Sequence, residues 1–326
     1  MFSDDGRCLK TPTIISDRSH TASEQMMAAI EEIVSKIEDW KGKSISIQPL
    51  SGGLTNTNYK VEADRTPFFV RVPGTSTELL AIDRKNEYFN SKAAAAAGVG
   101  PKVLYYLPDY QAMVLEFIDG RTMSRGSLNE PGMPARMAEA IKKLHAGPRF
   151  LTDFNMFRLT EYYLGICRDR SLPMPQGYPD RMPVVARIEN ALSVQPLPTV
   201  PCNNDLLAEN YIDDGRSLRL IDYEYSGNND PCFELGNTCQ EMQFSDRQIR
   251  EVCSAYFGEV TPDKIARMKL NMIMSDVGWG LWAAIQAKIS RIDFDFWGWA
   301  VERWNRALEK MDSEEFDGWL QDVQRR

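Results

Sequence analysis

The sequence lacks several features that would place it in common classes of protein. No run of 18 apolar residues occurs among its 326, so we expect no membrane-spanning helix and no integral membrane protein. The six cysteines contain no C-x-x-C pair, which argues against structural zinc, and they are too sparse for a disulfide scaffold. Residues 1–22 lack an apolar h-region and predict a mobile polar leader rather than a secretory signal. These absences favour a cytoplasmic protein with reduced thiols.

The sequence also lacks an excess of basic residues and has few histidines. The net charge is −8, from 46 acidic and 38 basic residues, which argues against a nucleic-acid partner and leaves room for a small cationic ligand. Only two histidines occur, which disfavours a Ser/His/Asp hydrolase. His20 lies in the polar leader, and His145 ends the segment IKKLHAG, where we expect it to cap or pack a helix.

Hydrophobic periodicity predicts a small sheet with one inserted helix in the first 120 residues. The sheet would need three strands before the helix and two after it. The predicted elements are a helix from Ser23 to near Gly42, strands on both sides of the loop at 51–58, a strand from Thr66 that stops at Pro73-Gly74, a helix over 83–98, and two strands within 101–120 that turn at Pro108-Asp109.

After Gly120 the pattern becomes mainly helical. The predicted elements are helices over 131–147 and 155–195, with a break at 171–180, a hairpin that turns at Asp214-Gly215, and helices to the end. We therefore predict an α+β fold with two lobes. The predicted boundaries are 23–115 for a β-rich N-terminal lobe, 116–120 for a hinge, and 121–326 for a helical C-terminal lobe.

The stretch NNDLLAENYIDDGRSLRLID carries the clearest chemistry. Asp205 and Asn210 are five residues apart, and after the hairpin Asp222 ends an apolar run. Mg²⁺ prefers oxygen ligands, which Asn210 and Asp222 would supply, while Asp205 could accept the proton of an attacking hydroxyl. D-x-x-x-x-N followed by a strand, a turn, a strand and I-D is typical of a kinase catalytic loop and its metal-binding aspartate. Taken alone, the stretch could equally be a solvated polar turn.

Residues upstream favour the kinase interpretation. Arg71 lies in the third predicted strand, where a nucleotide kinase keeps a cation for the phosphates, and Glu87 lies in the next helix, where it could pair with Arg71. The alternative for Arg71 is an exposed strand residue. The loop SGGLTNTN lacks G-x-G-x-x-G, so its amides and hydroxyls would make the phosphate contacts. The further residues predicted to bind nucleotide are Ser51, Gly52, Thr55 and Asn56 in this loop, and Glu116 and Ile118 at the hinge.

Three segments carry a resemblance to a known family. They are NNDLLAENYI, LIDYEYSGNNDPCFELGNTCQE and GWGLWAAIQAKISRIDFDFWGWAVERW. From about residue 45 to 308 the sequence resembles the choline/ethanolamine kinases, a family of protein-kinase-like small-molecule phosphotransferases. Aminoglycoside phosphotransferases share the first segment but would not be expected to carry W-G-L-W-x-x-x-Q-A-K-I-S. The resemblance implies a two-lobed fold and phosphorylation of an amino-alcohol hydroxyl with ATP and Mg²⁺.

The resemblance also implies roles for individual residues. Asp205 resembles the catalytic base, Asn210 and Asp222 resemble the metal ligands, and Glu224 resembles an acidic position near the metal. Arg71 matches the phosphate-binding cation and Glu87 its ion-pair partner. The sequence departs from the family at Asn203, where the family usually has His. That change bears on loop geometry and rate rather than on the metal ligands, and an Asn side chain can still bridge backbone groups.

An aromatic segment near the C-terminus suggests the acceptor. Trp279 and Trp282 are three residues apart and would share a helix face, and Phe294 and Trp299 follow them. A quaternary ammonium cannot donate hydrogen bonds and binds to aromatic faces, at about 0.5–2 kcal/mol per contact. These four residues therefore predict a choline cage, with a plain hydrophobic core as the alternative. We expect the counter-charge from Glu241 or Asp276, and we expect Trp297 and Trp304 in the core.

The predicted function is phosphorylation of choline to phosphocholine with ATP and Mg²⁺. Ethanolamine or another small amino alcohol is the close alternative, because its N–H₃ group would need carboxylates more than aromatic faces. An aminoglycoside-type enzyme would need an acidic, Trp-poor pocket. A pseudokinase-like protein that binds choline or nucleotide without turnover is a further alternative, supported only by Asn203. The sequence also allows a homodimer.

Overall fold

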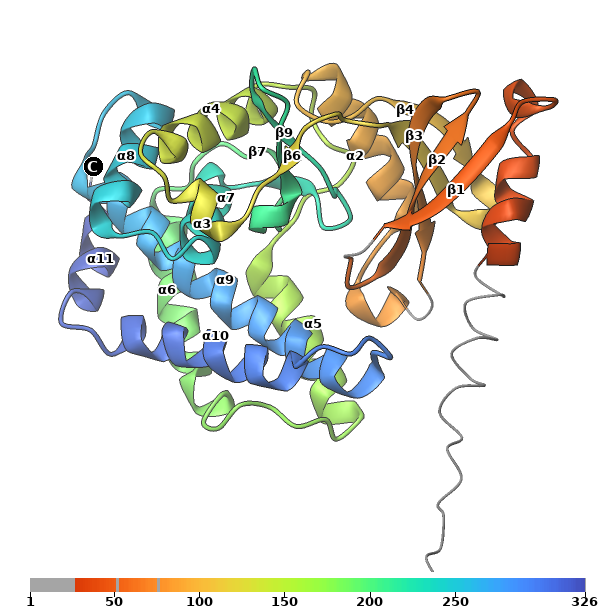
Figure 1. Cartoon of the computed structure of the whole chain (residues 1–326). Helices are drawn as coiled ribbons and strands as arrows, with labels where there is room; N and C mark the ends of the chain where they lie inside the picture. The colour runs from red at the N-terminus through yellow and green to blue at the C-terminus, as the bar shows by residue number, and fades with distance from the viewer. Residues whose placement is uncertain (1–26, 51–52, 75–76, 326) are drawn as a thin grey trace, which may run out of the picture.

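The computed structural model describes residues 27–50, 53–74 and 77–325 (Figure 1). The predictions for the leader at 1–22, for Ser23 as a helix cap, and for Ser51 and Gly52 lie outside the described residues. Within these ranges, no helix combines the length and the apolar character needed to cross a membrane. The described cysteines are unpaired and buried thiols: Cys167, Cys202, Cys232, Cys239 and Cys253.

The N-terminal lobe is a five-stranded antiparallel sheet in the order β1-β2-β3-β5-β4. The sequence pattern predicted its strands, three before the inserted helix and two after it, but not their order. In Figure 1 a helix over residues 27–35 lies on one side of this sheet, and α2 lies between the sheet and the C-terminal lobe. The elements are β1 Ile45–Leu50, β2 Asn56–Ala63, β3 Thr66–Pro73, η2 Thr77–Leu80, α2 Arg84–Ala96, β4 Val103–Leu107, η3 Pro108–Tyr110 and β5 Ala112–Glu116.

The first described helix is shorter than predicted. We expected it to continue to near Gly42, but it ends at residue 35, and a short 3-10 turn, η1 Glu38–Trp40, follows. Ile37 is extended, with φ −84° and ψ 104°. This bend buries Trp40, whose ring lies 4.8 Å from the ring of Phe68. Packing of a large aromatic side chain against the sheet therefore ends the helix early.

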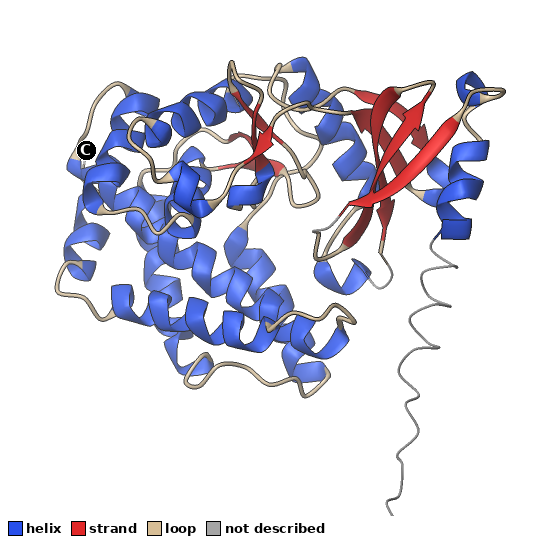
Figure 2. Cartoon of the chain, in the orientation of Figure 1, coloured by secondary structure: helices blue, strands red, loops and turns tan. Residues whose placement is uncertain are grey.

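The C-terminal lobe is mainly helical (Figure 2) and is built around α9, which packs against α5, α7, α10 and α11. Twenty residues of α9 are buried, so the helix is enclosed on most of its sides, as expected of a central helix. The helices of the C-terminal lobe are α3 Arg125–Leu128, α4 Met133–His145, α5 Met156–Asp169, η4 Pro179–Arg181, α6 Met182–Val194, α7 Pro231–Glu241, α8 Asp246–Phe257, α9 Pro262–Ile289, α10 Phe296–Met311 and α11 Phe316–Asp322.

Short strands present two loops at the junction of the lobes. β7 pairs with β10, and β6, β8 and β9 form a second small sheet. The β8–β9 turn is the predicted one: Asp214 Oδ1 accepts the backbone N–H of Arg216 and Ser217, and Gly215 has φ +83°. The strands are β6 Arg121–Thr122, β7 Val200–Cys202, β8 Tyr211–Asp213, β9 Leu218–Leu220 and β10 Gly227–Asn229, with a 3-10 turn, η5 Ala208–Asn210, before β8.

This arrangement confirms the α+β, two-lobed prediction. The loop between β7 and η5 carries Asp205, and the loop between β9 and β10 carries Asp222. Antiparallel pairing places Cys202 opposite Gly227 and Tyr211 opposite Leu220. Both loops therefore emerge from paired strands, and they lie beside each other.

Candidate active site

Arg71 joins the two lobes through buried salt bridges. Its Nη1 atom lies 2.8 Å from Oε1 of Glu87 in α2 and 2.6 Å from Oδ1 of Asp222 in the loop after β9. The Arg71 side chain is only 6% exposed, so its charge needs carboxylate partners. Burial lowers the pKa of Arg71, but the charges of Asp222 and Glu87 outweigh burial and raise the pKa above its usual range. The expected ion pair between Arg71 and Glu87 is present, and Asp222 meets the same guanidinium.

Glu224 gathers polar groups from the N-terminal lobe. Thr55 Oγ1 donates to Glu224 Oε1 at 2.7 Å, and Asn56 Nδ2 donates to Oε2 at 3.0 Å. Arg84 Nη1 lies 2.7 Å from Glu87 Oε2 and 3.3 Å from Glu224 Oε2. Burial, followed by the charges of neighbouring carboxylates, raises the pKa of Glu224 to about 7. The described part of the predicted phosphate loop therefore lies directly against this carboxylate.

The loops that carry Asp205 and Asp222 are tied together by backbone contacts. Asn210 Nδ2 donates to the backbone oxygen of Asp205 at 2.8 Å, and the backbone oxygen of Asn210 accepts the N–H of Ile221 at 3.0 Å. Asp222 has φ +66°, a left-handed conformation that is rare for a residue other than glycine and often marks a functional site. Among the described residues, no hydrogen bond occupies Asn210 Oδ1 or Asp222 Oδ2. These two oxygens fit the ligand type that Mg²⁺ prefers.

Asn203 links the same two loops through its side chain. Its Oδ1 accepts the backbone N–H of Asp205 at 3.1 Å, and its Nδ2 donates to the backbone oxygens of Ile221 at 3.1 Å and Asp222 at 2.7 Å. The side chain is buried, so these bonds replace contacts with water. Asn203 is therefore a bridge between the loop of Asp205 and that of Asp222.

Asp205 lies in an electrostatic setting that favours proton acceptance. Burial raises the pKa of its carboxyl well above the usual range, and the charge of Glu241 adds to this effect. The positive charge of Arg303 opposes it. A carboxylate with a raised pKa is a stronger base toward a hydroxyl.

The predicted aromatic residues divide into two connected groups. The Trp282 and Trp299 ring centroids lie 6.0 Å apart, and Phe294, which is 45% exposed, lies 5.7 Å from Trp299. Trp279 instead packs against Tyr225, with ring centroids 4.8 Å apart. Tyr225 connects the groups, because Trp282 Nε1 donates to its hydroxyl at 2.6 Å. The structure thus brings Trp282, Phe294 and Trp299 into one cluster.

Glu241 and Asp276, the two candidates for the counter-charge, are both paired with arginines in the structure. Arg303 donates from Nη1 and Nη2 to the two oxygens of Glu241, at 2.6 and 2.9 Å. Asp276 accepts from Arg306 at 2.5 and 3.1 Å. Both carboxylates are buried, and a buried charge needs a paired cation. The guanidinium of Arg303 also lies 4.1 Å from the centroid of the Trp299 ring, so it occupies one face of that ring.

Two further expectations concern tryptophan burial and the hinge. Trp304 is buried as predicted, but Trp297, which we expected in the core, is 39% exposed because it points outward from the first turn of α10. Glu116 ends β5, and its Oε2 accepts the backbone N–H of Lys102 at 3.1 Å. Ile118 is half-buried in the segment that follows.

Sequence reasoning missed three side chains in this region. Arg84 lies one turn before Glu87 in α2, and that three-residue spacing could have indicated it. Tyr225 ends the quoted D-Y-E-Y and could have been included with Glu224. Arg303 had no comparable signal, because its partner Glu241 is 62 residues away in the sequence.

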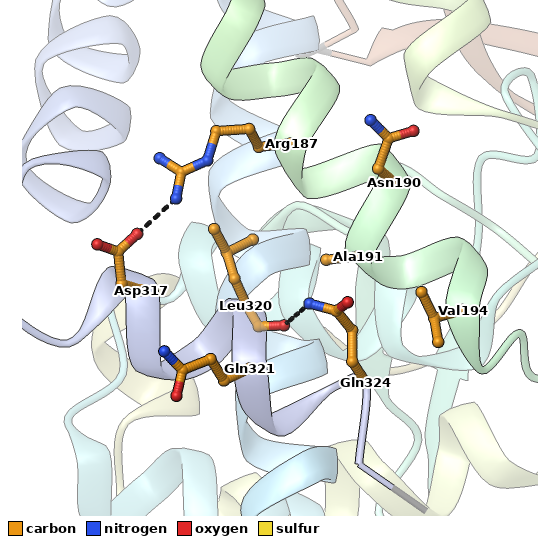
Figure 3. Close-up of a pocket in the computed structure, with 8 residues that line it drawn as sticks. All are labelled: Arg187, Asn190, Ala191, Val194, Asp317, Leu320, Gln321 and Gln324. Atoms are coloured by element: carbon orange, nitrogen blue, oxygen red, sulfur yellow. Dashed lines mark hydrogen bonds and ion pairs between the residues drawn. The ribbon is translucent and has the colours of Figure 1, made fainter.

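The described part of the chain has two notable pockets. One, of about 400 Å³, is bordered by Glu224 and by Tyr225, the residue that contacts Trp279 and Trp282. The other, of about 530 Å³, lies between α6 and α11 (Figure 3). There Arg187 pairs with Asp317, and Gln324 donates to the backbone oxygen of Leu320. This larger pocket contains none of the residues predicted for phosphoryl transfer.

Comparison with known proteins decides the family. The sequence pattern described as Choline/ethanolamine kinase matches residues 47–255. The chain belongs to the choline/ethanolamine kinase family. Ethanolamine kinase 1 of Mus musculus is 28% identical to it over 311 residues, which cover 82% of this chain and 84% of that protein. Membership of the choline/ethanolamine kinase family makes the chain a small-molecule kinase.

Solved structures agree with this assignment. A choline/ethanolamine kinase family protein from Mesorhizobium loti is 34% identical, with a TM-score of 0.81 and coverage of 92% of this chain and 99% of that one. Choline kinase LicA from Streptococcus pneumoniae is 26% identical, with a TM-score of 0.74 and coverage of 88% and 99%. A LicA complex with AMP is 25% identical, with a TM-score of 0.69 and coverage of 86% and 97%. The fold is therefore protein-kinase-like.

The bridge made by Asn203 generates the first prediction. Asn203→Ala is expected to lower kcat about tenfold, because it removes hydrogen bonds worth about 1 kcal/mol each between the two loops. Asn203→His keeps a donor for the same carbonyl oxygens and should retain more activity. The measurement is steady-state ADP release with ATP, Mg²⁺ and an amino alcohol. Wild-type turnover in Asn203→Ala would show that the bridge does not hold the loops for catalysis.

Proposed function

We propose that the chain is a choline kinase, which transfers the terminal phosphoryl group of ATP to the choline hydroxyl and gives phosphocholine and ADP. The observation that carries this proposal is the cluster of Trp282, Trp299 and Phe294. Arg303 connects this cluster to the proposed base, because it stacks on Trp299, binds Glu241, and its charge influences the pKa of Asp205. An aromatic surface would thus lie beside the proposed base.

Each polar group has a part in the proposed reaction. Asp205 orients the hydroxyl of the acceptor and takes its proton. Arg71 neutralises phosphate charge while Glu87 holds its guanidinium in place, 2.8 Å away. Mg²⁺, when held by Asn210 and Asp222, would supply further charge neutralisation on the phosphate oxygens. Glu224 fixes Thr55 and Asn56, whose loop faces the phosphates.

The nature of the pocket favours choline over ethanolamine. A trimethylammonium group cannot donate hydrogen bonds and is stabilised by aromatic faces, whereas a primary ammonium needs three acceptors. Glu241 and Asp276 already accept from arginines, so their charge is largely compensated. Phe294, which is 45% exposed, and the partly exposed Trp299 remain available as apolar surface, whereas the Trp282 ring that supports them is buried. Ethanolamine is the second candidate acceptor, supported by the mouse relative of that name.

Asp205→Asn tests the proposed base. This substitution keeps the size of the side chain but cannot accept the proton, so kcat is expected to fall by about 10²-fold or more while ATP still binds. Turnover is measured by ADP release and nucleotide binding by calorimetry. Asp180→Asn, at an exposed aspartate in η4, is the matched control and should behave as wild type. Substantial activity in Asp205→Asn would remove Asp205 from the role of base.

Trp282→Ala tests the acceptor site. Loss of this ring should raise the KM for choline about tenfold or more, and leave the KM for ATP within about twofold, because a cation–π contact contributes about 0.5–2 kcal/mol and the neighbouring rings also lose support. Trp304→Ala, which removes a buried tryptophan outside the cluster, is the control for general destabilisation. Equal changes in both KM values for Trp282→Ala would indicate a core residue instead.

A further inference from the structure

A buried polar cluster lies behind the loop that carries Asp205, and none of its members belongs to the predicted site. His145 ends α4, Cys202 ends β7, Glu234 lies in α7 and Tyr256 lies in α8. The first three side chains are buried, and Glu234 is completely excluded from solvent. Four elements thus bring titratable side chains to one point in the C-terminal lobe.

Glu234 holds the backbone of the loop. Its Oε1 and Oε2 atoms accept the N–H of Asn203 at 2.9 and 3.1 Å. Its Oε2 also lies 2.8 Å from Nε2 of His145. A carboxylate can only accept, so Nε2 of His145 must carry the proton that it shares with Glu234. The other ring nitrogen, Nδ1, lies 2.7 Å from the hydroxyl of Tyr256, which can donate to it.

The cluster acts on the proposed site through Asn203. A buried carboxylate is stable only when donors compensate it, and here the donors are His145 and the Asn203 backbone. Asn203 in turn contacts the backbone N–H of Asp205 and the backbone oxygen of Asp222. A shift of Glu234 would therefore move the backbone on which both Asp205 and Asp222 depend.

Two other interpretations of the cluster are weaker. Ligand-type atoms of His145, Cys202 and Glu234 lie within 4.8 Å of one another, as in a metal site. However, both Glu234 oxygens already accept N–H groups, and burial together with the charge of Glu234 raises the pKa of Cys202 well above its usual range, which favours a thiol over a metal-binding thiolate. The second interpretation is that His145 only fills space in the core. It is weaker because both ring nitrogens of His145 lie within hydrogen-bond distance of polar partners, Tyr256 and Glu234.

We propose that His145 is a positioning residue for phosphoryl transfer: through Glu234 it fixes the Asn203 backbone and so sets Asp205 against Asp222. The inference rests on the proposed function. It replaces our expectation that His145 merely caps or packs a helix.

Two substitutions of His145 separate positioning from packing. His145→Gln keeps an N–H donor that can reach Glu234, whereas His145→Phe keeps an aromatic ring without a donor. We expect His145→Phe to lower kcat about tenfold or more, with the KM values for ATP and choline within about twofold, and His145→Gln to recover most of kcat. A packing role predicts the reverse order, because Phe suits an apolar core better than Gln.

Hydrogen exchange of the peptide that spans residues 200–206 gives a readout that needs no turnover. The Asn203 amide should exchange faster in His145→Phe than in wild type or His145→Gln. Ile141→Val, one turn earlier in α4, is the control for a modest loss of packing and should change neither kcat nor this exchange. If wild type phosphorylates no amino alcohol, the proposed function fails, but the exchange comparison still decides the structural half of the inference.

A milder variant keeps the test valid if His145→Phe does not fold. Tyr256→Phe removes the hydroxyl that holds Nδ1, at a half-buried position, and should produce a smaller fall in kcat and a smaller rise in exchange at Asn203. Unchanged kcat and unchanged exchange in Tyr256→Phe, or equal activity of His145→Phe and His145→Gln, would overturn the proposal.

Discussion

The buried guanidinium of Arg71 fixes the relation between the two lobes. It contacts Glu87, which α2 brings from the N-terminal lobe, and Asp222, which follows β9 in the C-terminal lobe. Removing one partner of such a pair leaves an uncompensated buried charge and typically costs about 3–5 kcal/mol. This contact depends on the paired strands, on the position of α2 and on the left-handed backbone of Asp222. The residue proposed to bind phosphate, Arg71, is thus also the cation that joins the lobes, and it contacts Asp222, a proposed metal ligand.

A second layer of polar contacts supports the loops rather than the reactants. Asn203 bridges the loop of Asp205 to the backbone at Asp222, and Glu234 holds Asn203 from behind. Full satisfaction of buried polar groups rigidifies a site, because each unmade bond would leave a costly buried donor or acceptor. This layer gives a physical reason why an Asn at position 203 is compatible with an ordered loop. An Asn side chain offers both the donor and the acceptor that this bridge uses.

Local patterns in the sequence predicted much of the fold and part of the site. Alternating apolar residues indicated the strands around 51–58, Asp214-Gly215 indicated the hairpin, and the order of Arg71 and Glu87 indicated their ion pair. What escaped prediction depends on contacts between distant segments. Arg303 meets Glu241 across 62 residues, and His145 meets Glu234 across 89. Neither pairing leaves a periodic or motif signal, so the sequence did not indicate the partner of Glu241 or that of His145.

The acceptor is the centre of this account, and a direct comparison of substrates tests it. Steady-state ADP release should be measured with ATP and Mg²⁺ at varied concentrations of choline and of ethanolamine, with an aminoglycoside and no acceptor as controls. The aromatic cluster around Trp282 and the pairing of Glu241 with Arg303 predict a higher kcat/KM for choline than for ethanolamine. A higher kcat/KM for ethanolamine, or no release above the acceptor-free control with either amino alcohol, would contradict the proposed function.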